Sequence, residues 1–338
     1  MDCAIACPPY GRNDDQGLTV DQALSKVSEG HAKPSRSPLI WRQWRRDLHN
    51  LIGRRPVQTT HIGKRAGRVA IAPDGSYALA LDMERRLTAW NLQTGKKFRE
   101  VDMQEAGMIP RLAKGPDYGY WLKVLPGDVA RPRVLFGRPD RDNQFRLWDL
   151  ETGSTIRIFS GHSNGVSRCV VSQDGRRCLT GSEDKTLRLW DIESGETIRI
   201  FDGHSDGVVS IAMSPDGRHI LSTGAWEWPV RVWSVETGKT LRTFEGHTHH
   251  GRVTQLAITP DGCHGLSCAN LDNTLRLWDL ETCRTVRTFT GHCLDICCVD
   301  ITLDGRYAVS ASFDGTLRLW DLQTGDEVTR IGRFPTSS

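Results

Sequence analysis

Apolar and polar residues alternate in short runs from about residue 61 to the end of the chain, and these runs recur in six similar units. The third run of each unit closes on a tryptophan, and successive tryptophans stand 58, 42, 43, 45 and 42 residues apart. The six are Trp90, Trp148, Trp190, Trp233, Trp278 and Trp320. A repeat of this length is typical of a supersecondary unit that buries its apolar faces only against its neighbours.

The third unit, residues 161–201, shows the predicted strands most clearly. Its runs predict strands over Gly165–Val171, Arg177–Gly181, Thr186–Trp190 and Thr197–Phe201. Turns separate the runs at regular places, since Asp174 can bond its own backbone and Gly175 accepts a positive φ. Four short runs without a helical period predict one four-stranded antiparallel sheet per unit.

The units also carry Gly-His pairs about 30 residues before four of the tryptophans, at Gly161-His162, Gly203-His204, Gly246-His247 and Gly291-His292. With the Trp-Asp pairs, this pattern resembles the WD40 repeat. The resemblance implies an all-β fold, a β-propeller of four-stranded antiparallel blades over residues 59–334. Six blades are recognisable, and a degenerate seventh built from N-terminal residues is the alternative. The ring would close through the strand at 327–334 or through a strand near 56–61.

The resemblance further implies a hydrogen-bonded tetrad of His, Asp, Ser or Thr, and Trp in each intact blade. The residues it assigns to these structural tetrads are His162, Asp184, Trp190, His247, Asp272, Trp278, His292, Asp314 and Trp320. Thr180 or Ser182 would supply the hydroxyl of the first set. Such a set also has the composition of a hydrolase triad, but a catalytic interpretation requires several identical active sites. A buried structural network is therefore favoured.

Two units depart from the pattern near the start of the repeats. In the first, Glu84 stands where Asp is expected, and Trp90 is followed by Asn91. The second keeps Asp142, but its long spacing implies an insert of about 16 residues around 101–118. We expect these two blades to be the least stable.

The fourth unit departs in its turn between the second and third strands, which reads Ala225-Trp226-Glu227-Trp228-Pro229. We expect this turn to have lost the polar corner of the tetrad. Trp226 and Trp228, together with His249, His250 and Arg252 of the next loop, form the predicted partner-binding surface, because aromatic and Arg side chains dominate protein interfaces. The alternative is that one or both tryptophans fold back and cap the blade.

Residues 1–58 form a predicted N-terminal extension of different character. Its start resembles disordered sequence, and a short helix is predicted from Thr19 to about Gly30. A second helix over 39–52 is amphipathic and rich in arginine. This helix would dock on the propeller or join it to an upstream segment; binding to an acidic partner or a membrane surface is the alternative.

Composition restricts the function further. A net charge of +3 argues against a nucleic-acid-binding module. The start does not read as a signal peptide, no apolar run is long enough to span a membrane, and ten cysteines are most simply reduced thiols. We therefore expect a cytoplasmic protein. Cys263, His264 and Cys293 add to the histidines of the fifth and sixth units, but the loops that hold them lie on opposite faces of the expected propeller.

These observations predict a non-enzymatic scaffold for protein–protein interaction, with no catalytic residue, cofactor or metal. No phosphate-binding loop, zinc-protease motif or nucleophile elbow occurs in the sequence. The partners would be other proteins, and a monomer is favoured over a homo-oligomer. The alternatives are an enzyme or metal-binding protein that uses the His/Cys-rich fifth and sixth blades, and a nucleic-acid-binding module. The chain could also be a fragment of a longer protein.

Overall fold

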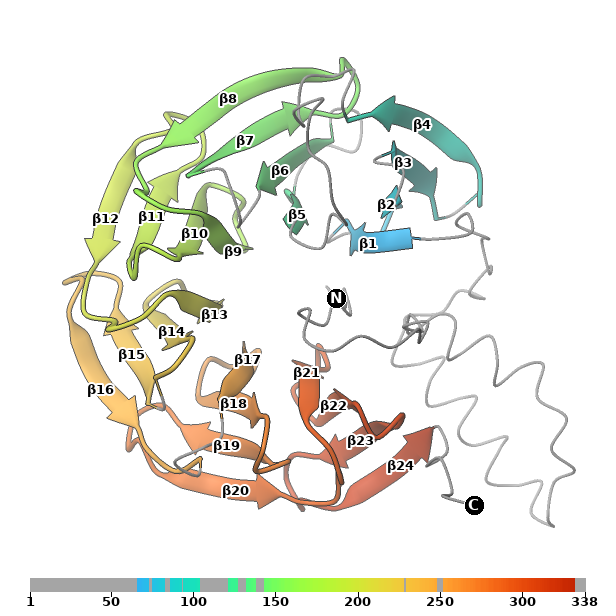
Figure 1. Ribbon diagram of the computed structural model, residues 1–338. Helices are drawn as coiled ribbons and strands as arrows, with labels where there is room; N and C mark the ends of the chain where they lie inside the picture. The colour runs from blue at the N-terminus through green and yellow to red at the C-terminus, as the bar shows by residue number, and fades with distance from the viewer. Residues whose placement is uncertain are drawn as a thin grey trace, which may run out of the picture.

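The computed structural model describes residues 66–72, 75–82, 86–92, 94–103, 121–126, 132–137, 143–227, 229–247 and 252–331. Every regular element in these ranges is a β-strand, and the strands form six four-stranded sheets in chain order with antiparallel neighbours. Figure 1 shows the sheets arranged around a central axis, with the first strand of each innermost and the fourth outermost. The predicted propeller of six four-stranded blades is confirmed. The described part of the chain holds no helix that could cross a membrane.

The first three sheets cover the N-terminal half of the repeats. The first contains β1 (Ala66–Ile71), β2 (Tyr77–Asp82), β3 (Arg86–Asn91) and β4 (Lys97–Asp102). The second contains β5 (Trp121–Val124), β6 (Arg133–Gly137), β7 (Gln144–Asp149) and β8 (Ser154–Ser160). The third contains β9 (Val166–Val171), β10 (Arg177–Ser182), β11 (Leu187–Asp191) and β12 (Thr197–Phe201), each within one residue of its predicted bounds.

The last three sheets repeat the same plan. The fourth contains β13 (Val208–Met213), β14 (His219–Gly224), β15 (Val230–Ser234) and β16 (Thr240–Phe244). The fifth contains β17 (Val253–Ile258), β18 (His264–Ala269), β19 (Leu275–Asp279) and β20 (Thr285–Phe289). The sixth contains β21 (Ile296–Ile301), β22 (Tyr307–Ser312), β23 (Leu317–Asp321) and β24 (Glu327–Ile331). Strand β24 therefore takes the outermost place of the last sheet; the N-terminal extension, Glu84 and Asp142 lie outside the described residues.

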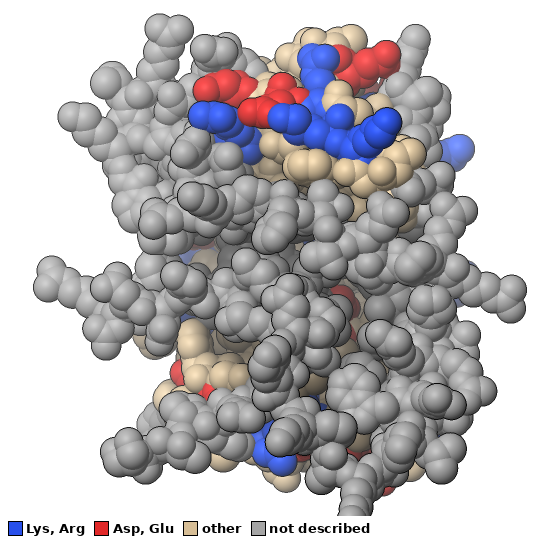
Figure 2. Space-filling view, turned by 90° about the vertical axis from the view of Figure 1, so that its right-hand side faces the viewer, with Lys and Arg blue, Asp and Glu red and all other residues tan. Residues whose placement is uncertain are grey.

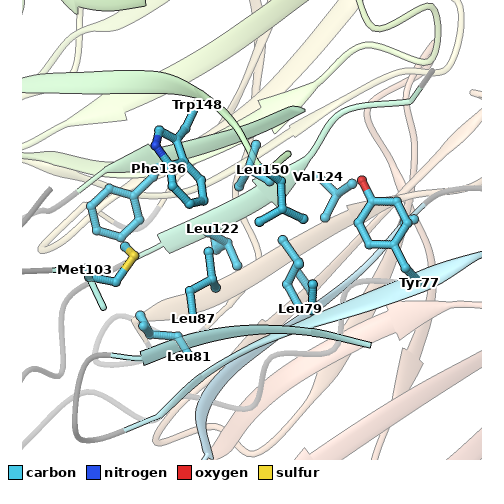
Figure 3. Close-up of a cluster of buried hydrophobic side chains, with 14 residues drawn as sticks. Tyr77, Leu79, Leu81, Leu87, Met103, Leu122, Val124, Phe136, Trp148 and Leu150 are labelled. Atoms are coloured by element: carbon cyan, nitrogen blue, oxygen red, sulfur yellow. The ribbon is translucent and has the colours of Figure 1, made fainter. Parts of the chain in front are cut away.

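The core is divided among the spaces between successive sheets. Five clusters of buried apolar side chains each combine residues of two neighbouring sheets. Figure 3 shows the first of them, where Leu79 and Leu87 face Leu122 and Trp148. Because a sheet between two neighbours buries both faces, an inner strand such as β11 has no exposed residue, whereas the first four residues of the outermost strand β12 alternate between half-buried and exposed.

The first and sixth sheets bury their apolar side chains less completely than the sheets between them. Trp90 is half-buried and Leu92 is 39% exposed, whereas the other five tryptophans of the repeat are buried. In the last sheet Leu317 and Ile331 are half-buried, although their counterparts in the third sheet are fully buried. Figure 1 shows the first and last sheets further apart than any other neighbours. Each has one lateral face that no described sheet covers.

Figure 2 views the molecule from the side of these two sheets, and where described residues are visible at the top, basic and acidic side chains adjoin one another. The first sheet carries ion pairs of Glu100 with Arg86, at 3.7 Å, and with Lys97. Exposed pairs of this kind contribute little to stability. The mixture of signs leaves no extended basic patch on the visible described surface.

Arginines of two outermost strands form hydrogen bonds to the following sheet. Arg157 donates from Nη1 to the carbonyl of Ser194 at 2.8 Å, and Arg287 donates to the carbonyls of Gln323 and Thr324 at 2.7 Å. The arginine passes directly over the glycine of the adjacent turn, so that a Cβ added to Gly195 would lie 2.5 Å from Arg157 Cδ. That glycine also has a positive φ of 78°. Both features explain why glycine occupies this turn in five of the six sheets.

The fifth sheet has Cys283 in this position, with a φ of 58° in the left-handed region. A side chain is strained there, so Cys283→Gly should raise the free energy of unfolding by about 1 kcal/mol despite the flexibility of glycine. Denaturant titration measures the change. Cys263→Gly, in an exposed turn of the same sheet, serves as a control without expected gain. An unchanged or lowered midpoint for Cys283→Gly would contradict the strain.

Candidate functional site

A chain of hydrogen bonds closes the corner of the third sheet. The Nδ1 atom of His162 lies 2.8 Å from Asp184 Oδ2, and its Nε2 atom lies 2.8 Å from Thr180 Oγ1. The indole of Trp190 donates to the same hydroxyl at 2.8 Å. Thr180 therefore supplies the hydroxyl that the sequence left open, while Ser182 donates to the carbonyl of Gly165. With a neutral histidine, Nδ1–H donates to the carboxylate and Nε2 accepts from the hydroxyl.

The fifth and sixth sheets repeat this geometry. His247 is 2.7 Å from both Asp272 and Ser267, and Trp278 donates to Ser267 at 2.8 Å. His292 is 2.8 Å from Asp314 and 2.7 Å from Ser310, to which Trp320 donates at 2.8 Å. The structure therefore brings all nine residues assigned to the tetrads together in their three sets.

The fourth sheet also has a complete polar corner, so the expectation that it was lost is wrong. Glu227 Oε2 lies 2.6 Å from His204 Nδ1, His204 Nε2 lies 2.6 Å from Ser222 Oγ, and Trp233 donates to that hydroxyl at 2.7 Å. Glutamate replaces aspartate at the same distance before the tryptophan of the third strand. Glu227 stands six residues before Trp233, as Asp184 stands six residues before Trp190, and counting back from the tryptophan would have revealed the substitution.

The hydroxyls of these four corners cannot act as nucleophiles. Thr180, Ser222, Ser267 and Ser310 are all 0% exposed, and each already accepts a hydrogen bond from an indole. A substrate could not reach them without unfolding the sheet. The corners are therefore satisfied buried networks that connect the strands of one sheet.

The loops above these corners emerge on one face of the propeller, because the start of each first strand pairs with the end of the second. Two of the predicted partner-binding residues meet there. Trp226 is 80% exposed, and the guanidinium carbon of Arg252 lies 6.0 Å from the centre of its ring. Trp226 therefore does not fold back to cap the sheet, since Glu227 fills that place. Trp228, His249 and His250 lie outside the described residues.

Three further exposed apolar side chains on this face were missed by the sequence analysis. They are Leu271 (63% exposed), Leu294 (52%) and Phe313 (56%). Phe313 corresponds in its turn to Glu183 of the third unit, and Leu294 corresponds to Asn164. In the sequence, these residues could have been recognised because they are apolar at loop positions where other units have polar residues. We call Trp226, Arg252, Leu271, Leu294 and Phe313 together the loop face.

Four segments of the chain, residues 153–191, 195–234, 238–279 and 283–321, match the family described as WD domain, G-beta repeat. They coincide with the third to sixth repeats and include all four complete corners. The chain belongs to the WD40-repeat family.

Individual relatives match over shorter stretches. Mitochondrial division protein 1 of Vanderwaltozyma polyspora is 26% identical over 104 residues, 30% of this chain and 15% of that protein. MST50-interacting protein 11 of Pyricularia oryzae is 35% identical over 71 residues, 20% of this chain and 22% of that protein. Small ribosomal subunit protein RACK1 of Neurospora crassa is also 35% identical over 71 residues, 20% of this chain and 22% of that protein. The chain thus spans less than a quarter of the length of these relatives.

The carboxylates of the WD40 corners are strongly acidic. Burial alone would raise the pKa of Glu227, but hydrogen bonds from Ser205 and His204 outweigh burial and lower the pKa to about 2. Hydrogen bonds from Thr316 and His292 likewise outweigh burial at Asp314 and lower its pKa to about 2. The folded protein therefore stabilises the charged form of each carboxylate.

This shift predicts a pH dependence of stability. A depressed carboxylate pKa stabilises the folded state above the unfolded values of 4.5 for Glu and 3.8 for Asp. The free energy of unfolding should therefore fall as the pH is lowered from about 4.5 toward 2. Denaturant titrations across this range measure the effect. The Asp314→Asn variant should show a shallower decline, and an equally steep decline would contradict the assignment to this corner.

The first two WD40 blades lack the hydroxyl of the corner. Ala80 pairs with Thr88, and Phe136 pairs with Arg146, at the position where Thr180 pairs with Arg188 in the third sheet. The buried indole N–H groups of Trp90 and Trp148 accordingly find no acceptor among the described residues. An unsatisfied buried donor lowers stability, in keeping with the expected weakness of these blades.

Restoring the hydroxyl should recover part of this loss. Ala80→Ser places an acceptor where the indole of Trp90 requires one, and it should raise the free energy of unfolding by about 1 kcal/mol. The same substitution in a Trp90→Phe background should bring no gain, because phenylalanine has no donor to satisfy. A double-mutant cycle of denaturation midpoints measures this coupling. Equal effects in both backgrounds would contradict the proposed bond.

The alternative metal site finds no support in the part of the chain that the structure describes. No three His, Cys, Asp or Glu side chains gather there in a way that could hold a metal ion. Cys263 and Cys293 are exposed free thiols, and Cys263 lies in a turn of the opposite face.

Proposed function

We propose that this chain is a non-enzymatic scaffold that binds another protein through its loop face. The observation that carries the proposal is the concentration of exposed Trp226, Leu271, Leu294 and Phe313 on one face of three consecutive blades. Large apolar side chains exposed together, with an arginine among them, are the composition of a protein interface. The rigid strands below hold the loops in place, so that binding requires little ordering.

Leu271 adds a reason to regard the exposure as functional. Its φ of 67° lies in the left-handed region, which disfavours leucine, and its side chain is mostly in solvent. Asp295 Oδ1 accepts a hydrogen bond of 3.0 Å from its backbone N–H and so helps to hold this conformation. Residues with strained backbone conformations tend to occur at binding and active sites.

The names of two relatives agree with this class of function. One is named as an MST50-interacting protein and another as a small ribosomal subunit protein, and each name places its bearer beside other macromolecules. The buried hydroxyls of the corners support the non-enzymatic part of the proposal, since they leave the repeated His-Asp sets without an accessible nucleophile.

A pair of glycine substitutions tests the proposal. Leu271→Gly and Cys283→Gly both relieve a positive φ in the fifth sheet, but only the first removes an apolar side chain from the loop face. Both variants should match or exceed the wild-type denaturation midpoint. In affinity capture followed by mass spectrometry, Leu271→Gly should lose specifically enriched proteins that Cys283→Gly and the wild type retain. Equal capture by all three proteins would overturn the assignment of the loop face.

A further inference from the structure

Two arginines from different blades lie toward the inner side of the propeller, and one of them, Arg252, stacks on Trp226. Arg168 lies on β9, the innermost strand of the third sheet, and Arg252 immediately precedes β17, the innermost strand of the fifth. Strand β13 of the fourth sheet contacts both β9 and β17. The two arginines therefore flank the fourth blade at its inner side, and the charge of Arg252 acts on Arg168.

The structure provides little compensation for these two charges. Arg168 remains exposed to solvent, but the protein crowded around it and repulsion from Arg252 both lower its pKa. Burial also lowers the pKa of Arg252, and the charge of Asp206 offsets this only in part. Among the described residues neither guanidinium forms an ion pair; Arg168 donates to the carbonyl of its neighbour Ser167 at 3.0 Å, and the buried Nε of Arg252 has no partner. A half-buried Arg252 with a second arginine near it favours an anion close to both.

Arg252 is also held in place before any ligand arrives. Its backbone N–H donates to Asn270 Oδ1 at 2.7 Å, and its carbonyl accepts from the N–H of Asn270 at 3.0 Å. The indole of Trp226 covers one side of the guanidinium. A fixed backbone and a stacked guanidinium reduce the entropy that a ligand must remove on binding.

We propose that Arg168, Arg252 and Trp226 form a binding site for an acidic peptide segment of the partner protein. One carboxylate of the segment would lie between the two guanidinium groups, and a neighbouring apolar side chain would lie on Trp226. This inference rests on the proposed scaffold function and specifies the chemistry of the partner. Arginine suits this role because its planar group binds a carboxylate through two hydrogen bonds.

The surroundings favour a peptide over a nucleic acid. Asp206 lies close enough to Arg252 to affect its pKa, so the site includes an acidic group of its own and offers no continuous basic surface to an extended polyanion. Binding to nucleic acid requires a broad basic surface. The exposed Leu271, Leu294 and Phe313 on the adjoining blades instead suit a segment that mixes acidic and apolar residues.

Binding of defined peptides to the full chain tests the proposal. The probe is a fluorescent pool of synthetic peptides in which Asp or Glu alternates with varied apolar residues, and fluorescence anisotropy measures binding. A matched pool with Asn and Gln in place of the acids, and a single-stranded DNA oligonucleotide, are the comparisons. We expect the acidic pool to bind at least about tenfold more tightly than either, and this binding to weaken as salt is added.

Substitutions of the arginines locate the binding. Arg252→Gln and Arg168→Gln should each weaken binding of the acidic pool by about tenfold or more. Arg218→Gln serves as the matched control, because Arg218 is an exposed arginine in a turn of the opposite face and its loss should change nothing. Thermal denaturation checks that the variants remain folded.

Several results would overturn the inference. They are equal binding of the acidic and amide pools, tighter binding of the oligonucleotide, or equal affinities for the Arg252→Gln, Arg168→Gln and Arg218→Gln variants. These results leave the scaffold proposal standing if Leu271→Gly still loses captured proteins. Equal capture by Leu271→Gly and Cys283→Gly would instead overturn the scaffold proposal itself, whatever the peptides show.

Discussion

Asp184→Ala should lower the free energy of unfolding by roughly 3 kcal/mol. The buried carboxylate of Asp184 accepts from His162 Nδ1 at 2.8 Å, from the backbone N–H groups of Ser163 and Thr186 at 2.9 and 3.0 Å, and from the hydroxyl of Thr186 at 2.7 Å. Alanine leaves these donors without an acceptor, and the one on His162 is fully buried. Equilibrium denaturation in urea measures the loss.

Two variants control this prediction. Asp174→Ala makes the same substitution in an exposed turn of the same sheet, where Asp174 bonds Ser172 and the backbone of Arg176, and it should lower stability by no more than about 1 kcal/mol. Asp184→Asn keeps one acceptor oxygen and should fall between the two. If Asp174→Ala and Asp184→Ala destabilise the protein equally, the corner does not hold the sheet together.

Trp226→Ala should reduce the affinity of the chain for its protein partner by roughly 2 kcal/mol, about thirtyfold, while leaving the fold intact. The side chain is 80% exposed, and its one described ring contact is with Arg252 at 6.0 Å, so folding gains little from it. In a complex the same indole would be buried. Quantitative mass spectrometry of captured proteins, together with thermal denaturation, measures both quantities.

Ile198→Ala is the matched control for this substitution. Ile198 is also a large exposed apolar residue, but it lies on the outermost strand β12 and away from the loop face. Its loss should leave the captured proteins unchanged. A large drop in thermal midpoint for Trp226→Ala would show that the indole supports the fold, and unchanged capture would place the partner elsewhere.

The fourth blade shows where reasoning from the sequence was insufficient. The two tryptophans of its turn suggested that the polar corner was lost, yet Glu227 between them reaches His204. The extra methylene of glutamate is accommodated because Gly224, against which its side chain packs, has no Cβ. Counting back from Trp233 would have revealed the acidic position, but the direction in which each side chain points depends on the packing around the turn.

The sequence by itself determined the strands, the turns and the repeated sheets. These features follow from local chemistry, since apolar runs and Asp-Gly turns each involve residues that are close along the chain.

Only the tertiary structure decided that Thr180 rather than Ser182 completes the corner, that Trp226 points to solvent and that the charge of Arg252 acts on Arg168. The two arginines stand 84 residues apart, and no local pattern relates them. Their proximity depends on how three blades pack around the axis. Strand formation is encoded within each repeat, whereas the chemistry of the loop face arises from distances between repeats.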